Sequence, residues 1–406
     1  MADIVPFKAV RPKRSKVHLV SSRPYFTYKK SHLKTKLETN PYSFLHVINP
    51  EFKKNHGTKP NSIERFNLVK DQYEKFKVNN LFVQDKKSSF YLYKQTSSLG
   101  VFTGIIAGAS VLDYTNDLIK KHENTILKRE KLFEKYLDVC HFHAEPVLLS
   151  YESNDEIENI ISSKKVERPE YEFTTTDNKN HELWIIDDIA IVKKLVNAFK
   201  KVNKIYIADG HHRAASSKLY FEGHQHNPSS KYFLSFLVDT KNVHIIEFNR
   251  LVKNIFPHKP DSLFKALNQN FVLSEGGVSE VSPSNKKEIG MYFNKKWYLL
   301  TIKKELLKNL TYKQKLNSQL VSDFILNSIL NIPDLRNDKR VEFVSGIDTN
   351  QNTFKKIDKL ENGLFLKLFP HTMEEIIQIA DLGETMPPKS TWIEPKIRSG
   401  VTIYEY

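Results

Sequence analysis

The segment Ile205–Tyr220, IYIADGHHRAASSKLY, constrains this chain most, because a single Asp-Gly pair joins an apolar run to a helical pattern. The β-rich run Asn203–Ala208 predicts a buried strand, and Ala214–Glu222 predicts a helix. Gly210 permits a tight turn and close approach of the backbone to another group. The segment therefore predicts a strand that passes directly into a helix, as in α/β folds.

The polar residues of this turn favour phosphate binding. The first N–H groups of a helix and its positive dipole end attract anions. His211 and His212 add donors there, and Arg213 can grip a phosphate through two N–H groups. Asp209 ends the strand, where a carboxylate can hold Mg²⁺ or orient a hydroxyl.

Two other interpretations of the turn stay open. Asp209 can simply cap the helix and leave the two histidines exposed to solvent. Alternatively, His211 and His212 can ligate a metal ion, although adjacent residues do not share a helix face and would chelate awkwardly. We favour phosphate binding over both.

Apolar periodicity predicts the remaining elements. We expect helices at 62–79, 125–137, 187–201, 261–268, 312–330 and 372–380. We expect strands at 4–11, 89–95, 100–108, 146–151, 182–186, 232–239, 244–249, 290–303 and 364–368, and one more between the prolines of 40–51. These elements predict an α/β (mixed α+β) fold, with an N-terminal body over 1–257 and a smaller α/β domain over 258–406.

Charge and cysteine content narrow the partners and the compartment. The 62 basic and 47 acidic side chains give a net charge of +15, which suits an anionic ligand or a lysine-rich solvated surface. The lysines are scattered and no helix face is rich in arginine, so we expect no nucleic-acid partner. Cys140 is the only cysteine and fits a reducing compartment. With neither a secretory signal nor a long apolar run, the sequence predicts a cytoplasmic protein with no membrane partner.

Segments spread over nearly the whole chain carry a family resemblance. The turn ADGHHR at 208–213 resembles the signature of the ParB/sulfiredoxin-like superfamily, in which a Gly-x-x-Arg turn binds nucleotide or phosphate. Further segments resemble one branch of it, a family associated with free L-serine kinases that use pyrophosphate. They are Arg11-Pro12, Arg23–Tyr25, NPYSFLHVINPE at 40–51, KKHENT at 120–125, FNRLVK at 248–253 and MPPKSTWIEPKIRSG at 386–400.

The resemblance implies a ParB/sulfiredoxin-like core and an enzyme that makes O-phospho-L-serine from free L-serine, with pyrophosphate as donor and Mg²⁺ as cofactor. The sequence contains no Walker loop, no kinase glycine loop and no dinucleotide-binding glycine motif, which is in keeping with that donor. An ADP- or ATP-dependent small-molecule kinase of the same superfamily stays open, as does the oligomeric state.

The same superfamily suggests two alternative functions of other classes. A ParB-like nucleotide- or nucleic-acid-binding protein should carry a helix-turn-helix, and none is convincing here. A sulfiredoxin-like reductase needs a cysteine in the Gly-x-x-Arg turn, where this chain has His211 and His212. The sequence therefore argues against the reductase and favours the kinase over the ParB-like protein.

The resemblance also implies catalytic residues. Asp209, His211 and His212 belong to the turn, with Asp209 the expected metal contact. Glu38 and Glu123 are candidate acceptors of the serine hydroxyl proton. Without the family, Glu38 reads as helix surface, and Glu123 as an acid at a solvated helix start.

Further residues are expected to bind phosphate or substrate. With Gly210 and Arg213, the phosphate-binding set comprises Lys389, Ser390, Thr391, Arg11 and Lys396, and the substrate-binding set comprises His122 and Arg23. Arg250 can face a phosphate too, or simply end its strand. A single arginine is more often part of a surface ion pair, and the 386–400 segment can be an ordinary loop. The family's aspartate after the early Pro-Tyr pair is replaced by Phe26, so its role is not carried over.

Overall fold

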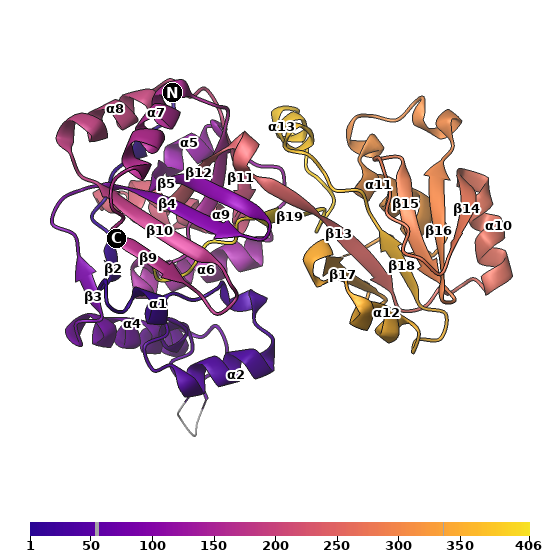
Figure 1. The fold of residues 1–406 in the computed structure, drawn as a ribbon, viewed down its shortest axis with the longest axis horizontal. Helices are drawn as coiled ribbons and strands as arrows, with labels where there is room; N and C mark the ends of the chain where they lie inside the picture. Colours follow the sequence, from indigo (N-terminus) through magenta and orange to yellow (C-terminus); the bar gives the residue numbers. More distant parts are fainter. Residues whose placement is uncertain (53–56, 336) are drawn as a thin grey trace. The chain divides into compact units, whose positions relative to one another are not determined.

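The computed structural model describes residues 1–52, 57–335 and 337–406. The chain forms two compact units (Figure 1). Unit 1 comprises Met1–Lys121, Thr125–Val243 and Pro395–Tyr406, and unit 2 comprises His122–Asn124 and His244–Glu394. The predicted boundary between residues 257 and 258 instead falls inside unit 2. The prediction differs from the structure because the chain passes between the units more than once. A single boundary in the sequence cannot represent that path.

Unit 1 is built on a mixed sheet in the order β6-β11-β8-β12-β5-β4-β10-β9, with β1 paired to β5. Its strands are β1 (Ile4–Val5), β4 (Phe90–Ser97), β5 (Gly100–Ser110), β6 (Ile119–Lys120), β8 (Val147–Tyr151), β9 (Tyr171–Thr174), β10 (Asn180–Ile186), β11 (Ile205–Asp209) and β12 (Tyr232–Asp239). Two short pairs lie outside it: β2 (Val10–Pro12) with β3 (Phe82–Gln84), and β7 (Phe142–His143) with β20 (Tyr404–Glu405). Strand β11 pairs antiparallel with β8, so the end of β11 lies beside the start of β8.

The helices of unit 1 pack their apolar sides on this sheet and on one another. They are α1 (Val17–Val20), α2 (Lys30–Thr39), α3 (Leu45–Ile48), α4 (Ile63–Val78), α5 (Val111–Thr115), α6 (Leu127–Cys140), α7 (Asp155–Lys165), α8 (Ile189–Lys200) and α9 (His211–Gly223). Ile157 of α7 and Leu195 of α8 are buried in the main core. Helices α7 and α8 begin where the side chains of Asn154 and Asp188 accept hydrogen bonds from first-turn N–H groups.

Unit 2 contains an antiparallel sheet in the order β14-β16-β15-β18-β13-β17, with β19 paired to β13. Its strands are β13 (His244–Val252), β14 (Phe271–Gly277), β15 (Glu288–Phe293), β16 (Lys296–Ile302), β17 (Val341–Ser345), β18 (Leu364–Lys367) and β19 (Thr391–Glu394). Its helices are α10 (Pro260–Asn270), α11 (Asn317–Val321), α12 (Gln351–Ile357) and α13 (Met373–Asp381). Alternate residues of the strands enter two cores, one on each face: Val252 faces one core and Leu251 the other.

The structure confirms the mixed α/β class and most of the predicted elements. The strand–glycine–helix reading of 203–222 is confirmed by β11 and α9, and the strands at 89–95 and 100–108 by the antiparallel pair β4–β5. The strand predicted within 40–51 is wrong, because α3 forms there. Phe44, Leu45 and Val47 are all fully buried, and a short apolar run buried on every side does not distinguish strand from helix.

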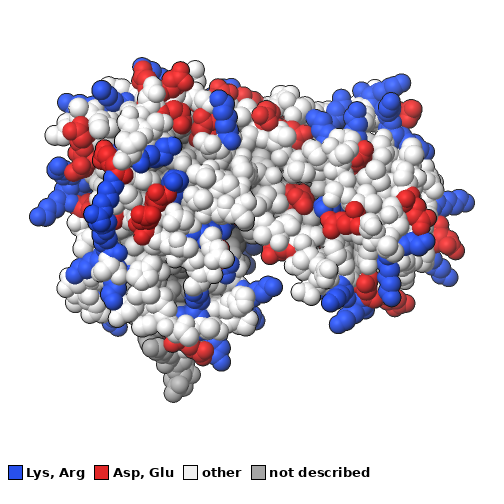
Figure 2. All heavy atoms as spheres, viewed as in Figure 1, with Lys and Arg blue, Asp and Glu red and all other residues white. Residues whose placement is uncertain are grey.

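One face of the molecule carries charged side chains of both signs (Figure 2). On the face shown in Figure 2, acidic side chains lie among the lysines and arginines of both units. Within the part of the chain that the structure describes, no helix has the length and apolar character needed to span a bilayer.

Candidate functional site

The turn between β11 and α9 depends on a glycine in two ways. Gly210 has φ of 101°, in the left-handed region that side chains rarely adopt. A Cβ atom at this position would also lie 3.0 Å from Nη2 of Arg213. The turn therefore uses glycine both for its backbone conformation and to let the Arg213 guanidinium fold back onto the backbone.

Arg213 is held by a side chain at the end of β11 and by backbone carbonyls just before β8. Its Nη2 donates to Oδ2 of Asp209 at 3.1 Å. Its Nη1 donates to the carbonyl oxygens of Glu145, at 3.1 Å, and of Pro146. Both carbonyls immediately precede β8, which the sheet places next to β11. The side chain keeps 23% of its surface exposed, so this firmly held cation still reaches solvent.

Asp209 lies between two cations. Oδ2 accepts from Arg213, and Oδ1 is 3.2 Å from the Nζ atom of Lys396. Burial alone would raise the pKa of Asp209, but the charges of Lys396 and Arg213 outweigh burial and lower it to about 2. The carboxylate is therefore ionised at neutral pH and is a poor proton acceptor.

The two histidines of the turn lie in different environments. His211 is buried, whereas His212 is half-buried and its Nε2 accepts a hydrogen bond from the backbone N–H of Ile126 at 3.1 Å. When neutral, His212 therefore carries its proton on Nδ1. Among the described residues, no three His, Cys, Asp or Glu side chains are grouped so that they could hold a metal ion. The metal interpretation of the histidine pair gains no support.

The expected Mg²⁺ contact at Asp209 does not fit this donor set. Both carboxylate oxygens are already bound by cationic side chains, and a single carboxylate is a small share of the oxygen ligands that Mg²⁺ needs. We therefore assign no chemical step to a metal at this position.

The C-terminal segment that carries Lys396 is fixed by its own contacts in unit 1. The backbones of Ser399 and Ser22 exchange hydrogen bonds of 2.8 and 3.2 Å, and Ser399 Oγ donates to Glu145 at 2.8 Å. Arg398 is buried and binds Asp177, and it donates to Thr175 Oγ1 at 2.7 Å. These contacts hold Lys396 beside Asp209.

Three other predicted residues of unit 1 have partners away from the turn. The guanidinium of Arg23 stacks over the ring of Tyr28 at 4.5 Å. Arg11 is buried and binds the carboxylates of Asp85 and Glu170 at 2.9 and 3.0 Å. Glu38 lies exposed on α2, 3.7 Å from Lys34. Of the predicted set, the structure of unit 1 thus brings together Asp209, Gly210, His211, His212, Arg213 and Lys396.

In unit 2, the segment 122–124 lies against the residues that precede the Pro-Pro-Lys-Ser-Thr loop. The carbonyl of buried His122 accepts from Met386 N at 2.8 Å, and Asn124 donates to Thr385 Oγ1 at 3.0 Å. Glu123 lies between these two contacts in sequence and is half-buried. Two segments that the sequence analysis selected separately are therefore neighbours.

The three candidate residues of that loop differ in their surroundings. Lys389 is exposed and has φ of 54°, a left-handed conformation uncommon for lysine. Ser390 is buried, and its Oγ lies 2.7 Å from the carbonyl of Pro387 and 3.0 Å from Oγ of Ser318. Thr391 begins β19 and pairs with Glu247. Lys389 is thus the residue of the three that is presented to solvent, while Ser390 anchors the loop.

The anchor of Ser390 continues into a buried polar chain that the sequence analysis missed. Ser318 Oγ lies 2.9 Å from Nε2 of His371, and Nδ1 of His371 lies 2.7 Å from Oε2 of Glu375. Only the spacing of His371 and Glu375, four residues apart at the start of a helix, could have suggested it. Ser318 is remote in sequence, as Glu145 is from Arg213, and no local pattern indicates either contact.

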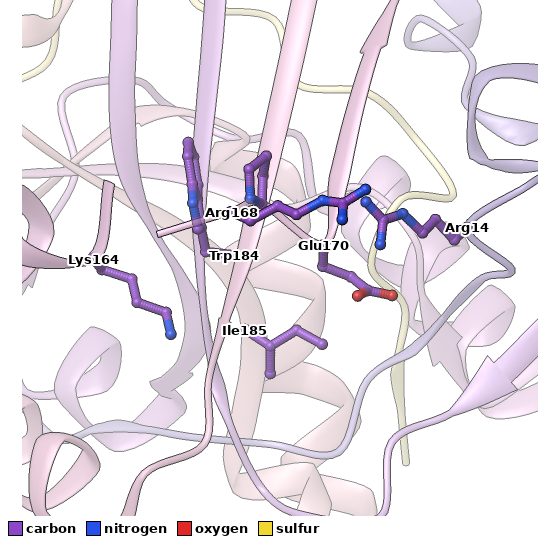
Figure 3. Close-up of a pocket in the computed structure, with 7 residues that line it drawn as sticks. Arg14, Lys164, Arg168, Glu170, Trp184 and Ile185 are labelled. Atoms are coloured by element: carbon purple, nitrogen blue, oxygen red, sulfur yellow. The ribbon is translucent and has the colours of Figure 1, made fainter. Parts of the chain in front are cut away.

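A pocket of about 210 Å³ lies elsewhere in unit 1 (Figure 3). Arg14, Lys164, Arg168, Glu170 and Trp184 are among the residues that line it. In Figure 3 the guanidinium groups of Arg14 and Arg168 point toward each other near the carboxylate of Glu170. None of the residues predicted to be functional lines this pocket, so we do not assign the candidate site to it.

The comparisons with known proteins give one family and several distant structures. The chain resembles SbnI from Staphylococcus aureus (13% identity, TM-score 0.40, 73% of this chain and 85% of that one). It also resembles a free serine kinase variant in complex with ADP (14%, 0.36, 74% and 92%) and a conserved hypothetical protein from Pyrococcus furiosus (15%, 0.35, 74% and 94%). We draw no functional argument from likenesses at this level.

A comparison with curated proteins gave no match. The family model described as "Protein of unknown function (DUF1015)" matches residues 4–325, which is most of the chain. That match includes the turn at Gly210 and the whole of β13. The chain therefore belongs to the DUF1015 family.

Proposed function

We propose that this protein is a phosphotransferase that moves a phosphoryl group from pyrophosphate to the hydroxyl of free L-serine. The observation that carries the proposal is the convergence of Arg213 and Lys396 on Asp209 at the first turn of α9. The sequence resemblance of the ADGHHR and MPPKST segments to pyrophosphate-dependent serine kinases supplies the substrates.

The charges of the turn suit a phosphate group. Two cations surround one carboxylate, and the positive end of the α9 dipole adds to their field. Phosphoryl transfer leaves little covalent work for the protein, which mainly aligns the reactants and offsets the negative charge that develops on the oxygens. A fixed guanidinium that still reaches solvent, such as that of Arg213, meets both requirements.

The low pKa of Asp209 assigns it a positioning role within this proposal. A group with a pKa of about 2 does not accept the serine hydroxyl proton efficiently at neutral pH. Asp209 instead holds Arg213 and Lys396 in place for the donor. Glu123, with Glu38 as the alternative, remains the proposed proton acceptor, and Lys389 a proposed second phosphate contact carried by unit 2.

The test is phosphorus NMR of the purified full-length protein with L-serine and Mg²⁺, to which pyrophosphate, ADP or ATP is added in separate samples. We expect a phosphoserine resonance in the pyrophosphate sample. Phosphoserine only with ADP or ATP would replace the donor and leave the acceptor. Its absence from every sample would refute the kinase proposal. Omission of Mg²⁺ with added chelator tests the expected cofactor directly.

A further inference from the structure

Arg250 lies near the C-terminal end of β13, and its side chain is completely buried. The residue pairs with Phe343 of β17 on one side and with Leu366 of β18 on the other. Its guanidinium carbon lies 4.6 Å from the centre of the Phe343 ring. A charged side chain thus occupies a position in the sheet where its neighbours are apolar.

The guanidinium uses only part of its hydrogen-bonding capacity. Nη1 donates to the carbonyl of Phe248 on its own strand. Neither Nε nor Nη2 has a hydrogen-bond partner among the described residues. Burial lowers the pKa of Arg250 to about 9, which still leaves it charged at neutral pH. A buried charge without a counter-ion is costly and is rarely kept unless something binds it.

We propose that Arg250 anchors an oxyanion-binding site in unit 2, which takes a carboxylate or a phosphoryl group. Nε and Nη2 are adjacent on one edge of the guanidinium, where they can donate in parallel to two oxygens of the same group. These are the two donors that find no partner in the described part of the chain. A lysine could not replace them, because its ammonium is a point charge without this planar fork.

A second cation lies on the same aromatic cluster. The ring of Phe248 stacks on that of Phe343, with centroids 5.9 Å apart and an angle of 16° between the planes. The exposed ammonium of Lys389 is 5.9 Å from the centre of the Phe248 ring. Lys389 therefore reaches solvent beside the rings of Phe248 and Phe343, where it can attract an anion. Arg250 lies buried against the Phe343 ring, where it can bind the anion once the anion has lost its water of hydration.

The position of Phe343 allows access without unfolding. Strand β17 is at an edge of its sheet, and Phe343 is only half-buried although it covers Arg250. Rotation of that side chain would open a path while the backbone hydrogen bonds between β13 and β17 remain. We therefore expect an Arg250 site that opens through Phe343.

The inference deepens the proposed function and rests on it only for the identity of the ligand. An amino acid acceptor carries a carboxylate, and the sequence analysis assigned no residue to that group. The planar fork of the Arg250 guanidinium matches the two oxygens of such a carboxylate. The same fork can bind inorganic phosphate, so the experiment compares the two ligands.

The test measures dissociation constants by calorimetry for L-serine and for inorganic phosphate, at an ionic strength held constant with potassium chloride. Wild type is compared with Arg250→Met and with the control Arg340→Met. Arg340 belongs to the same unit but donates to Asp338 and to three backbone carbonyls. All titrations are repeated with Lys396→Met, which removes a cation from the turn of unit 1 and so weakens anion binding only there.

We expect Arg250→Met to weaken one of the two ligands at least tenfold while its melting temperature without ligand equals or exceeds that of wild type. Arg340→Met should bind as wild type and melt at a lower temperature. The inference is overturned if Arg250→Met binds both ligands as wild type does, if wild type binds neither, or if Arg250→Met melts as low as Arg340→Met. Arg250-dependent binding without phosphoserine formation would refute only the proposed reaction, and formation without such binding only this inference.

Discussion

Arg213 in unit 1 and Arg250 in unit 2 differ in how their positive charges are stabilised: by partners and by contact with water. Arg213 has a carboxylate and two carbonyls as partners and keeps part of its surface in water. Arg250 is fully buried, and its one hydrogen bond among the residues that the structure describes goes to a carbonyl of its own strand. The first is a preorganised cation whose geometry is fixed before any ligand arrives, whereas the second is stabilised fully only by an added anion.

This difference gives a way to distinguish an arginine that is part of a preorganised site from an arginine that awaits a ligand. A satisfied arginine contributes to stability, so its removal leaves unpaired groups behind. An unsatisfied buried arginine lowers stability, so an apolar side chain of similar volume removes a cost. Opposite changes in stability are therefore expected for the same substitution at the two positions.

The largest effect should come from Arg213→Met. Loss of a charge that stabilises the transition state typically lowers kcat by roughly 10²–10³-fold. The same change orphans two carbonyls and leaves Asp209 with one cation, so the unfolding free energy should fall by about 1–3 kcal/mol. Phosphoserine formation and urea denaturation measure the two effects. The comparison with Arg250 fails if Arg213→Met is as stable as wild type.

Gly210→Ala should have the next largest effect. The alanine methyl group would meet the Arg213 guanidinium in a backbone conformation that costs about 1–2 kcal/mol for a side chain. Gly223→Ala, at the other end of the same helix, is the matched control, because a Cβ there meets nothing within 4 Å. Thermal denaturation should separate the two variants. Equal melting temperatures would show that the turn is not under the expected constraint.

The smallest effect should be the loss of stability at low pH that depends on Asp209. Since the pKa of Asp209 is lowered in the fold to about 2, its contribution to stability is present above the usual value near 4 and is lost as pH falls toward 2. After screening of a partly exposed group, about 1 kcal/mol is expected. Between pH 5 and pH 2, the free energy of unfolding should therefore fall less for Asp209→Asn than for wild type. Parallel curves would argue against the two ion pairs.

Much of the fold and part of the site could be predicted from the sequence. Local patterns were enough for β11, α9 and the pair β4–β5, since their period and their glycine act within a few residues. The same patterns failed at 40–51, where burial on all sides removes the period. The family resemblance gave Arg11 and Ser390 a phosphate-binding role that stays a prediction, while the structure places both in internal polar contacts.

What the sequence by itself determined is the turn: a strand, a glycine with positive φ and a helix that starts with two histidines and an arginine. This is so because backbone conformation and side-chain period are set by neighbours in the chain. Only the tertiary structure decided that Lys396 meets Asp209, that Glu145 and Pro146 hold Arg213, and that Arg250 has no counter-ion among the described residues. Those contacts join residues far apart in sequence, and their formation depends on how whole strands pair and pack.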